Sequence, residues 1–185
     1  MITGLRYIPN FVSEHSAKDL IDTIDHQFWM TDMKRRVQHY GYVYDYKKRI
    51  VTSDMALGGL PDWLADLAEQ VHTTGYISAM PDQVIINEYV PGQGISPHVD
   101  CEPCFDDTIL SLSLGSACLM DFTHIEGQHT NSILLAPRSL LIMAGEARYD
   151  WKHGIAARKS DVVDGKRIAR QRRISLTMRK VILDD

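Results

Sequence analysis

Residues 108–124 read TILSLSLGSACLMDFTH, which is one apolar run alternating with serine, a Gly-Ser break and a second apolar run. Similar runs lie on both sides: QVIINEYV (83–90), SILLAP (132–137), SLLIMAG (139–145) and RRISLTMR (172–179). Short strand-like runs separated by Gly, Pro and Asp, with no helical pattern between them, are typical of antiparallel sandwiches and barrels. We therefore predict a jelly-roll core, a double-stranded β-helix, over residues 81–185.

Two amphipathic helices are predicted before this core. Ser13 can cap the first helix, whose apolar stripe is Ala17, Leu20, Ile21, Ile24 and Phe28. The second opens at Pro61 and stops before Gly75, with the stripe Trp63, Leu64, Leu67, Ala68 and Val71. Residues 1–80 thus form an N-terminal extension whose helices cover the core. The expected fold class is α+β, mainly β with flanking helices.

The composition favours one domain over residues 1–185. The chain has 185 residues, 44% of them hydrophobic, a net charge of −4 and three cysteines. This charge argues against a strongly basic nucleic-acid binder but leaves room for a local basic patch. No apolar run approaches membrane-spanning length and residues 1–12 lack a signal-peptide pattern, so we expect a cytoplasmic monomer without membrane contact. For such a protein, an odd number of cysteines predicts reduced thiols.

Three residues predict a metal site. His98 and Asp100 are two positions apart, so an extended segment directs both side chains to one face. His153 follows a later strand, and strands distant in sequence become neighbours in a jelly roll. Two histidines and one carboxylate are the ligand set of non-haem Fe(II) oxygenases, which keep coordination positions open for substrates. A lone His-x-Asp pair is common, so the prediction depends on all three residues.

The last strand carries a second polar group. In RISLTMR, alternation puts Arg173, Ser175 and Arg179 on one face. One interpretation is an edge strand with its polar face in water. The other is that two arginines on an inward face hold both carboxylates of a dicarboxylic co-substrate. The predicted metal site favours the second.

The segment NEYVPGQGISPHVD, residues 87–100, leads into the metal pair. Asn87 and Tyr89 share a strand face and offer hydrogen bonds, and Pro and Gly then turn the chain. The ordered set Asn-x-Tyr, Pro-Gly-x-Gly-Ile, His-x-Asp, His-Gly-Ile and Arg-x5-Arg resembles the AlkB family of Fe(II)/2-oxoglutarate dioxygenases. Within this family, the chain looks most similar to the AlkB domain of homologues that hydroxylate wobble uridines in tRNA. The segments that carry this similarity are SLSLGS, MDF and LLAPRSLLIMAGEARYDWKHGI.

This resemblance implies a cofactor set and a ligand set. Fe(II) would be bound by His98, Asp100 and His153, with 2-oxoglutarate and O2 as co-substrates. Arg173 and Tyr89 would hold the distal carboxylate of 2-oxoglutarate.

It also implies roles for the neighbours of these residues. Arg179 and Asn87 would lie near the carboxylate beside the keto group. Ser175 stands where some family members have Asn. Glu102 stands where several nucleic-acid demethylases place an acid that touches the target base, although an acid on a loop is otherwise simply solvated.

The implied activity is oxidative demethylation or hydroxylation of alkylated or modified nucleobases in DNA or RNA, tRNA included. The alternative is a hydroxylase or demethylase of a protein or small molecule with the same cofactors. A zinc hydrolase would leave the two arginines without a role, and a non-catalytic jelly-roll module would need neither them nor the metal ligands.

A tyrosine-rich stretch between the helices is a candidate substrate flap. Tyr42, Tyr44 and Arg49, with the neighbouring Tyr40, Tyr46, Lys47 and Lys48, could stack on a flipped or single-stranded base and contact phosphate. GKRIARQRR, residues 165–173, is a second basic candidate, and either stretch could instead be a solvated loop. Cys101-x2-Cys104 alone predicts no zinc site. The remaining histidines are expected on the surface: His15, His26, His39, His72, His124 and His129.

Overall fold

A computed structural model describes residues 2–31, 33–127 and 129–183 of the chain. Its helices are α1 (Glu14–Asp25), α2 (Asp62–His72) and the short α3 (Glu146–Tyr149), with a 3-10 turn at Ser53–Met55. The strands are β1 (Leu5–Ile8), β2 (Val37–Tyr40), β3 (Gln83–Tyr89), β4 (Ile95–His98), β5 (Thr108–Gly115), β6 (Cys118–His124), β7 (Thr130–Leu135), β8 (Leu140–Ala144), β9 (Trp151–Ile155), β10 (Ser160–Val163), β11 (Lys166–Ala169) and β12 (Arg173–Arg179).

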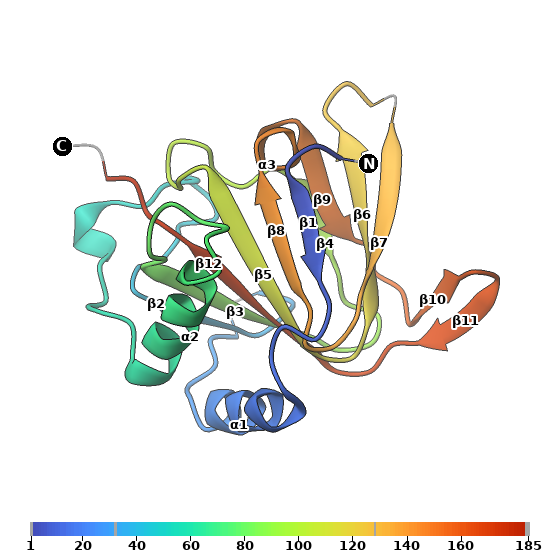
Figure 1. Cartoon of the computed structure of the whole chain (residues 1–185), viewed down its shortest axis with the longest axis horizontal. Coiled ribbons are helices and arrows are strands. Elements are labelled where there is room, and N and C mark those ends of the chain that lie inside the picture. Colours follow the sequence, from blue (N-terminus) through green and yellow to red (C-terminus); the bar gives the residue numbers. More distant parts are fainter. Residues whose placement is uncertain (1, 32, 128, 184–185) are drawn as a thin grey trace.

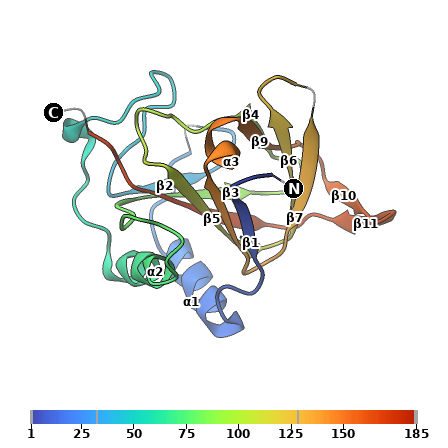
Figure 2. The same ribbon diagram turned by 45° about the horizontal axis from the view of Figure 1, so that its top comes forward.

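The strands form two antiparallel sheets and a separate hairpin (Figure 1). The larger sheet has the order β1-β8-β5-β12-β3-β2, and the smaller has the order β4-β9-β6-β7. Figure 2 shows α1 and α2 against the side of the larger sheet that faces away from the smaller one. The predicted jelly roll with covering helices is confirmed.

Strand alternation separates two apolar clusters, one on each face of the larger sheet. On the outer face, Ile174 and Leu176 of β12 pack in one cluster with Ile24 of α1 and Leu64 of α2. On the inner face, a second cluster includes residues of β5, β6 and β8, among them Phe122 of β6. The polar positions of β12 therefore face the space between the two sheets.

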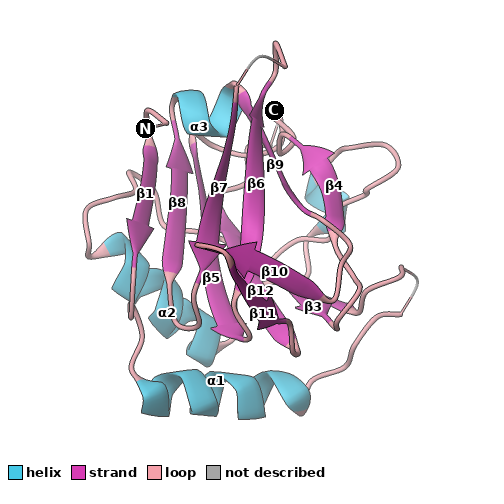
Figure 3. Cartoon of the chain, turned by 90° about the vertical axis from the view of Figure 1, so that its right-hand side faces the viewer, coloured by secondary structure: helices cyan, strands magenta, loops and turns pink. Residues whose placement is uncertain are grey.

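Most predicted elements are present, with corrections at several of them. Helix α1 ends at Asp25, so Phe28 lies beyond it and is 85% exposed rather than part of the buried stripe. Pro61 is the N-cap residue of α2 rather than its first helical residue, because the helix begins at Asp62. Strand β9 and the β10–β11 hairpin were not predicted. Strands β1 and β2, from within residues 1–80, complete the edges of the larger sheet, as Figure 3 shows for β1.

Two cysteines depart from the prediction of reduced thiols. Cys101 and Cys104 form a disulfide, while Cys118 is a buried free thiol. The turn after Asp100 brings the two Cα atoms to 5.3 Å, a separation that a disulfide spans. Within the described ranges, no helix has the length and apolar character needed to cross a bilayer.

Candidate active site

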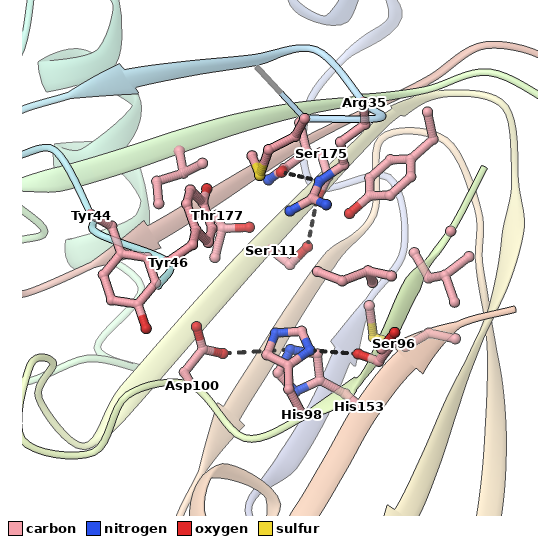
Figure 4. A pocket seen from close by; sticks show the side chains of 18 of the residues that line it. Arg35, Tyr44, Tyr46, Ser96, His98, Asp100, Ser111, His153, Ser175 and Thr177 are labelled. Carbon is pink, nitrogen blue, oxygen red and sulfur yellow. Dashed lines mark hydrogen bonds and ion pairs between the residues drawn. The ribbon is translucent and has the colours of Figure 1, made fainter. Parts of the chain in front are cut away.

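The three predicted metal ligands lie together between the sheets. His98 ends β4 and is paired in register with His153 of β9, while Asp100 follows two residues after His98. One ligand atom from each residue lies within 4.8 Å of the other two. Nε2 of His153 is 3.4 Å from Oδ2 of Asp100, and Figure 4 shows the three side chains converging. This arrangement offers two imidazoles and one carboxylate to a single ion.

The protonation of these groups suits metal binding. Burial lowers the pKa of His153 to about 4, so its imidazole is neutral near pH 7. Burial disfavours the charge of Asp100, yet Arg179 and His153 together hold the pKa of that carboxyl well below its usual range. Nδ1 of His98 lies 2.8 Å from the carbonyl oxygen of Ser96 and donates to it, so Nε2 is the ring nitrogen that could bind a metal.

The two arginines of β12 lie on the inner face of the sheet. β12 is flanked by β5 and β3, and Arg173 and Arg179 are 2% and 8% exposed. The solvated edge strand is therefore excluded. Arg173 lies opposite Tyr89 in register, and Ser175 lies opposite Asn87, so the residues expected around a co-substrate share one face.

Several buried polar atoms in this region have no hydrogen-bond partner in the described part of the chain. Among the described residues, they include Nε and Nη1 of Arg173, Nε of Arg179 and Oδ2 of Asp100. Nη2 of Arg173 donates to Oγ of Ser113 at 2.8 Å, and Arg179 pairs with Oδ1 of Asp100. Unpaired buried charged groups are costly, so these atoms point to a ligand. All three residues line one cavity of about 640 Å³, where an anion and a cation fit the free donors and the free acceptor.

The predicted substrate residues divide into two groups. Tyr44 and Arg49 line the cavity, and Nη2 of Arg49 donates to the carbonyl oxygen of Val99 at 3.1 Å. The described residues that line it do not include Tyr42 or Glu102. Tyr42 instead borders a separate hollow beside α2, and Glu102 is exposed in the turn after Asp100.

The second basic candidate, residues 165–173, is largely engaged elsewhere. Its first part forms β11 in the hairpin that projects from the molecule in Figure 1. Arg170 is buried against Asp161, and Arg172 pairs with Glu88 and Asp25.

Two further residues of this region were not assigned to the site from the sequence. Arg35 lines the cavity and donates from Nε to Oδ1 of Asn87 at 2.8 Å. His39 is half-buried rather than on the surface. Its ring packs edge-on against the ring of Tyr46, with 5.9 Å between the ring centres. Burial lowers the pKa of His39 to about 4. The only signal for either residue was its nearness to the tyrosine-rich stretch.

Arg148 of α3 was also missed. Its guanidinium is buried and donates to the carbonyl oxygens of Asp100 at 3.0 Å and Cys101 at 3.1 Å. A further contact reaches the carbonyl oxygen of Phe105 at 3.4 Å. Arg148 therefore fixes the loop that carries the metal carboxylate.

Comparison with known proteins agrees with this geometry. Residues 4–179 match the profile described as the 2OG-Fe(II) oxygenase superfamily. The chain belongs to this superfamily and is a dioxygenase. The family uses Fe(II), 2-oxoglutarate and O2, and the cluster of His98, Asp100 and His153 is compatible with iron.

The relatives lie in the AlkB branch, as the motifs indicated. The chain is 43% identical over 168 residues to mouse tRNA (carboxymethyluridine(34)-5-O)-methyltransferase ALKBH8, covering 86% of this chain and 25% of that protein. It is 38% identical over 203 residues to the Arabidopsis thaliana alkylated DNA repair protein ALKBH8 homolog, covering 97% and 59%. The chain thus spans less than two thirds of either relative. The solved structure of OsALKBH1 shares the fold, with a TM-score of 0.72, 15% identity and 96% of each chain covered.

Proposed function

We propose that this chain oxidatively demethylates or hydroxylates modified bases in nucleic acid, with Fe(II) held by His98, Asp100 and His153. The observation that carries the proposal is a single cavity in which this ligand set lies with two buried arginines that have unpaired N–H groups. The names of the mouse and Arabidopsis relatives, which mention tRNA and alkylated DNA, support nucleic acid as the substrate class.

The protein's part in the reaction is binding and orientation. When bound, the metal with O2 and 2-oxoglutarate supplies the oxidant, so that one oxygen atom enters a substrate C–H bond and the co-substrate leaves as succinate and CO2. Arg173 would hold the distal carboxylate of 2-oxoglutarate through its free N–H groups, with Tyr89 beside it. Arg179 and Asn87 would lie near the other carboxylate. Because Arg179 already pairs with Oδ1 of Asp100, the carboxylate would hold the metal through its other oxygen, which has no hydrogen-bond partner.

The position of the oxidised carbon decides the product. A hydroxymethyl group on a ring nitrogen breaks down to formaldehyde and the free N–H, which is demethylation. A carbon-linked side chain keeps its hydroxyl group. The described residues are consistent with both outcomes.

The lining of the cavity supports a base as the entering group. Tyr44 and Tyr46 offer aromatic faces, while Lys34, Arg35 and Arg49 offer positive charge. A base must be flipped out of a duplex or be single-stranded to enter such a site. A cytoplasmic location and a monomeric state stay predictions from the sequence.

The test is incubation of the purified chain with cellular tRNA and with alkylated DNA and RNA oligonucleotides, followed by mass spectrometry of the nucleosides. We expect a gain of one oxygen or a loss of a methyl group that requires both Fe(II) and 2-oxoglutarate and is absent in His98→Ala. Oxidation of a protein or metabolite fraction, with no change in any nucleoside, would contradict the nucleic-acid assignment and favour the alternative substrate classes.

A further inference from the structure

Two consecutive arginines just before β2 make different contacts on β3. Arg35 donates from Nε to Oδ1 of Asn87 at 2.8 Å. Arg36 donates to the two carboxylate oxygens of Glu88 at 2.5 and 2.7 Å. Because Asn87 and Glu88 are neighbours on a strand, their side chains point to opposite faces of the sheet. Arg35 therefore contacts the cavity face, and Arg36 contacts the outer face.

The contact from Arg35 fixes which way the Asn87 amide points. A guanidinium group has only donors, so the amide atom that faces it must be the oxygen. The NH2 group of Asn87 is then turned away from Arg35 and is the part of this side chain that can donate to an anion. Without Arg35, the amide could rotate and present its oxygen instead, which would repel a carboxylate.

The surroundings hold Arg35 in this position. Its Cζ atom lies 5.9 Å from the ring centre of Tyr89, a distance at which a cation and an aromatic face attract each other. Figure 4 shows Arg35 and Ser175 on the same side of the cavity, across from His98 and Asp100. Ser175 is the register partner of Asn87, so Arg35 reaches the part of the cavity proposed for the co-substrate.

We propose that Arg35 is a positioning residue for 2-oxoglutarate, which acts by holding the Asn87 amide with its NH2 group available to the co-substrate carboxylate. This inference rests on the proposed function, because it requires that the cavity binds 2-oxoglutarate. Arg35 lies on the segment before β2, outside the motifs on β3, β4, β9 and β12 that define the site.

The test is titration of 2-oxoglutarate into the Mn(II)-loaded chain by calorimetry, which needs no turnover. Arg35→Met removes the donors and keeps most of the volume, and we expect its dissociation constant for 2-oxoglutarate to rise about tenfold. Arg36→Met is the matched control, since it loses an ion pair on the outer face. We expect it to lower the melting temperature and to change the dissociation constant by less than about twofold.

The variant Asn87→Ala tests whether Arg35 acts by positioning the Asn87 amide or by attracting the 2-oxoglutarate anion directly. If Arg35 acts through the amide, adding Arg35→Met to Asn87→Ala should weaken 2-oxoglutarate binding by no more than about twofold. An equal loss in both backgrounds would show that Arg35 attracts the anion by itself and would overturn the inference. Wild-type affinity in Arg35→Met would overturn it as well. Failure of the wild-type chain to bind 2-oxoglutarate would overturn the proposed function and this inference together.

Discussion

At the scale of single residues, Asp100 is held through both its side chain and its backbone. Arg179 pairs with one carboxylate oxygen, and Arg148 binds the carbonyl oxygens of Asp100 and Cys101. Because Asp100 follows β4 rather than lying within it, no strand ladder fixes its position. The two arginines therefore replace strand pairing as the means of aiming the carboxylate at a metal.

Arg148→Lys should loosen this loop, since a single ammonium group cannot reach three carbonyl oxygens in the fork geometry of a guanidinium. We expect the affinity for Mn(II), measured by calorimetry, to fall roughly tenfold.

Arg170→Lys is the control, because Arg170 is a second buried arginine whose partner, Asp161, lies outside the cavity. It should lower the melting temperature and keep the metal affinity. Equal metal affinity in the two variants would show that Arg148 has only a general structural role.

The site residues that could be identified from the sequence are polar or charged side chains that recur on one face of a strand. His98, Asp100, Arg173 and Arg179 stand at even spacings, so one face could be inferred for each pair. Arg35 lies outside the described strands, where no period indicates which way a side chain points. Tyr42 was grouped with Tyr44 because both belong to one tyrosine-rich stretch, but this stretch is not a continuous strand, and Tyr44 lines the cavity whereas Tyr42 borders a separate hollow.

At the scale of elements, the site depends on how closely β4 and β9 approach. A Cβ atom at Gly154, next to His153, would lie 2.9 Å from the backbone nitrogen of Pro97 and 3.0 Å from its Cα atom. Only a residue without a side chain lets the two strands come this near. The distance between His98 and His153 is thus set by a glycine.

Gly154→Ala should push β4 away from β9 and separate the two imidazoles. We expect Mn(II) affinity to fall by about tenfold or more and the melting temperature to drop by several degrees. Gly59→Ala is the control, since nothing lies within 4 Å of an added Cβ atom there. Unchanged metal binding in Gly154→Ala would contradict this account of the strand pair.

The outer face of β3 carries an ion cluster that should make stability depend on pH. Hydrogen bonds from Arg36 and then Arg172 hold the pKa of Glu88 below its ordinary value of 4.5. A carboxylate with a lowered folded-state pKa stabilises the fold above its unfolded pKa, and this stabilisation is lost as the pH falls through the folded-state value.

Glu88→Gln should therefore cost about 1–2 kcal/mol of unfolding free energy at pH 7. The difference in melting temperature from wild type should shrink below about pH 4.5, where Glu88 of the unfolded chain begins to take up a proton while folded Glu88 still keeps its charge. Thermal unfolding followed by circular dichroism across this range measures it. A gap that stays constant down to pH 3 would mean that the ion pairs contribute nothing.

Elements with long, regular apolar runs could be predicted from the sequence. Short or irregular elements could not. β5 and β12 have clear alternation and were expected at their observed positions. β9 is only five residues, WKHGI, with one glycine and few apolar positions, so its strand character comes from pairing with β4 and β6. The disulfide depends on a turn whose shape the spacing of its cysteines does not specify.

At the scale of the whole molecule, positive charge is concentrated at the cavity although the chain carries a net charge of −4. Its described lining includes the cationic side chains of Lys34, Arg35, Arg49, Arg173 and Arg179, with Asp100 as the carboxylate. A nucleic acid should therefore be attracted to this region rather than to the surface as a whole.

Binding of a single-stranded oligonucleotide should accordingly weaken as salt increases. We expect the double variant Lys34→Ala/Arg49→Ala to lower affinity and to reduce the slope of log affinity against log salt by about 2, one for each lost charge. The comparison is Lys166→Ala/Arg167→Ala on the projecting hairpin, which should leave the slope unchanged. The opposite pattern, measured by fluorescence anisotropy, would move the nucleic-acid surface to the hairpin.

The central claim is that one cavity holds a metal between His98, Asp100 and His153 and a diacid on Arg173 and Arg179. Anaerobic addition of Fe(II) and then 2-oxoglutarate tests it directly, because an α-keto acid chelated to Fe(II) absorbs visible light. We predict that this absorption develops in the wild-type chain, is lost in His153→Ala, and needs about tenfold more 2-oxoglutarate in Arg179→Met. No absorption in the wild-type chain, or the same absorption in His153→Ala, would contradict the account.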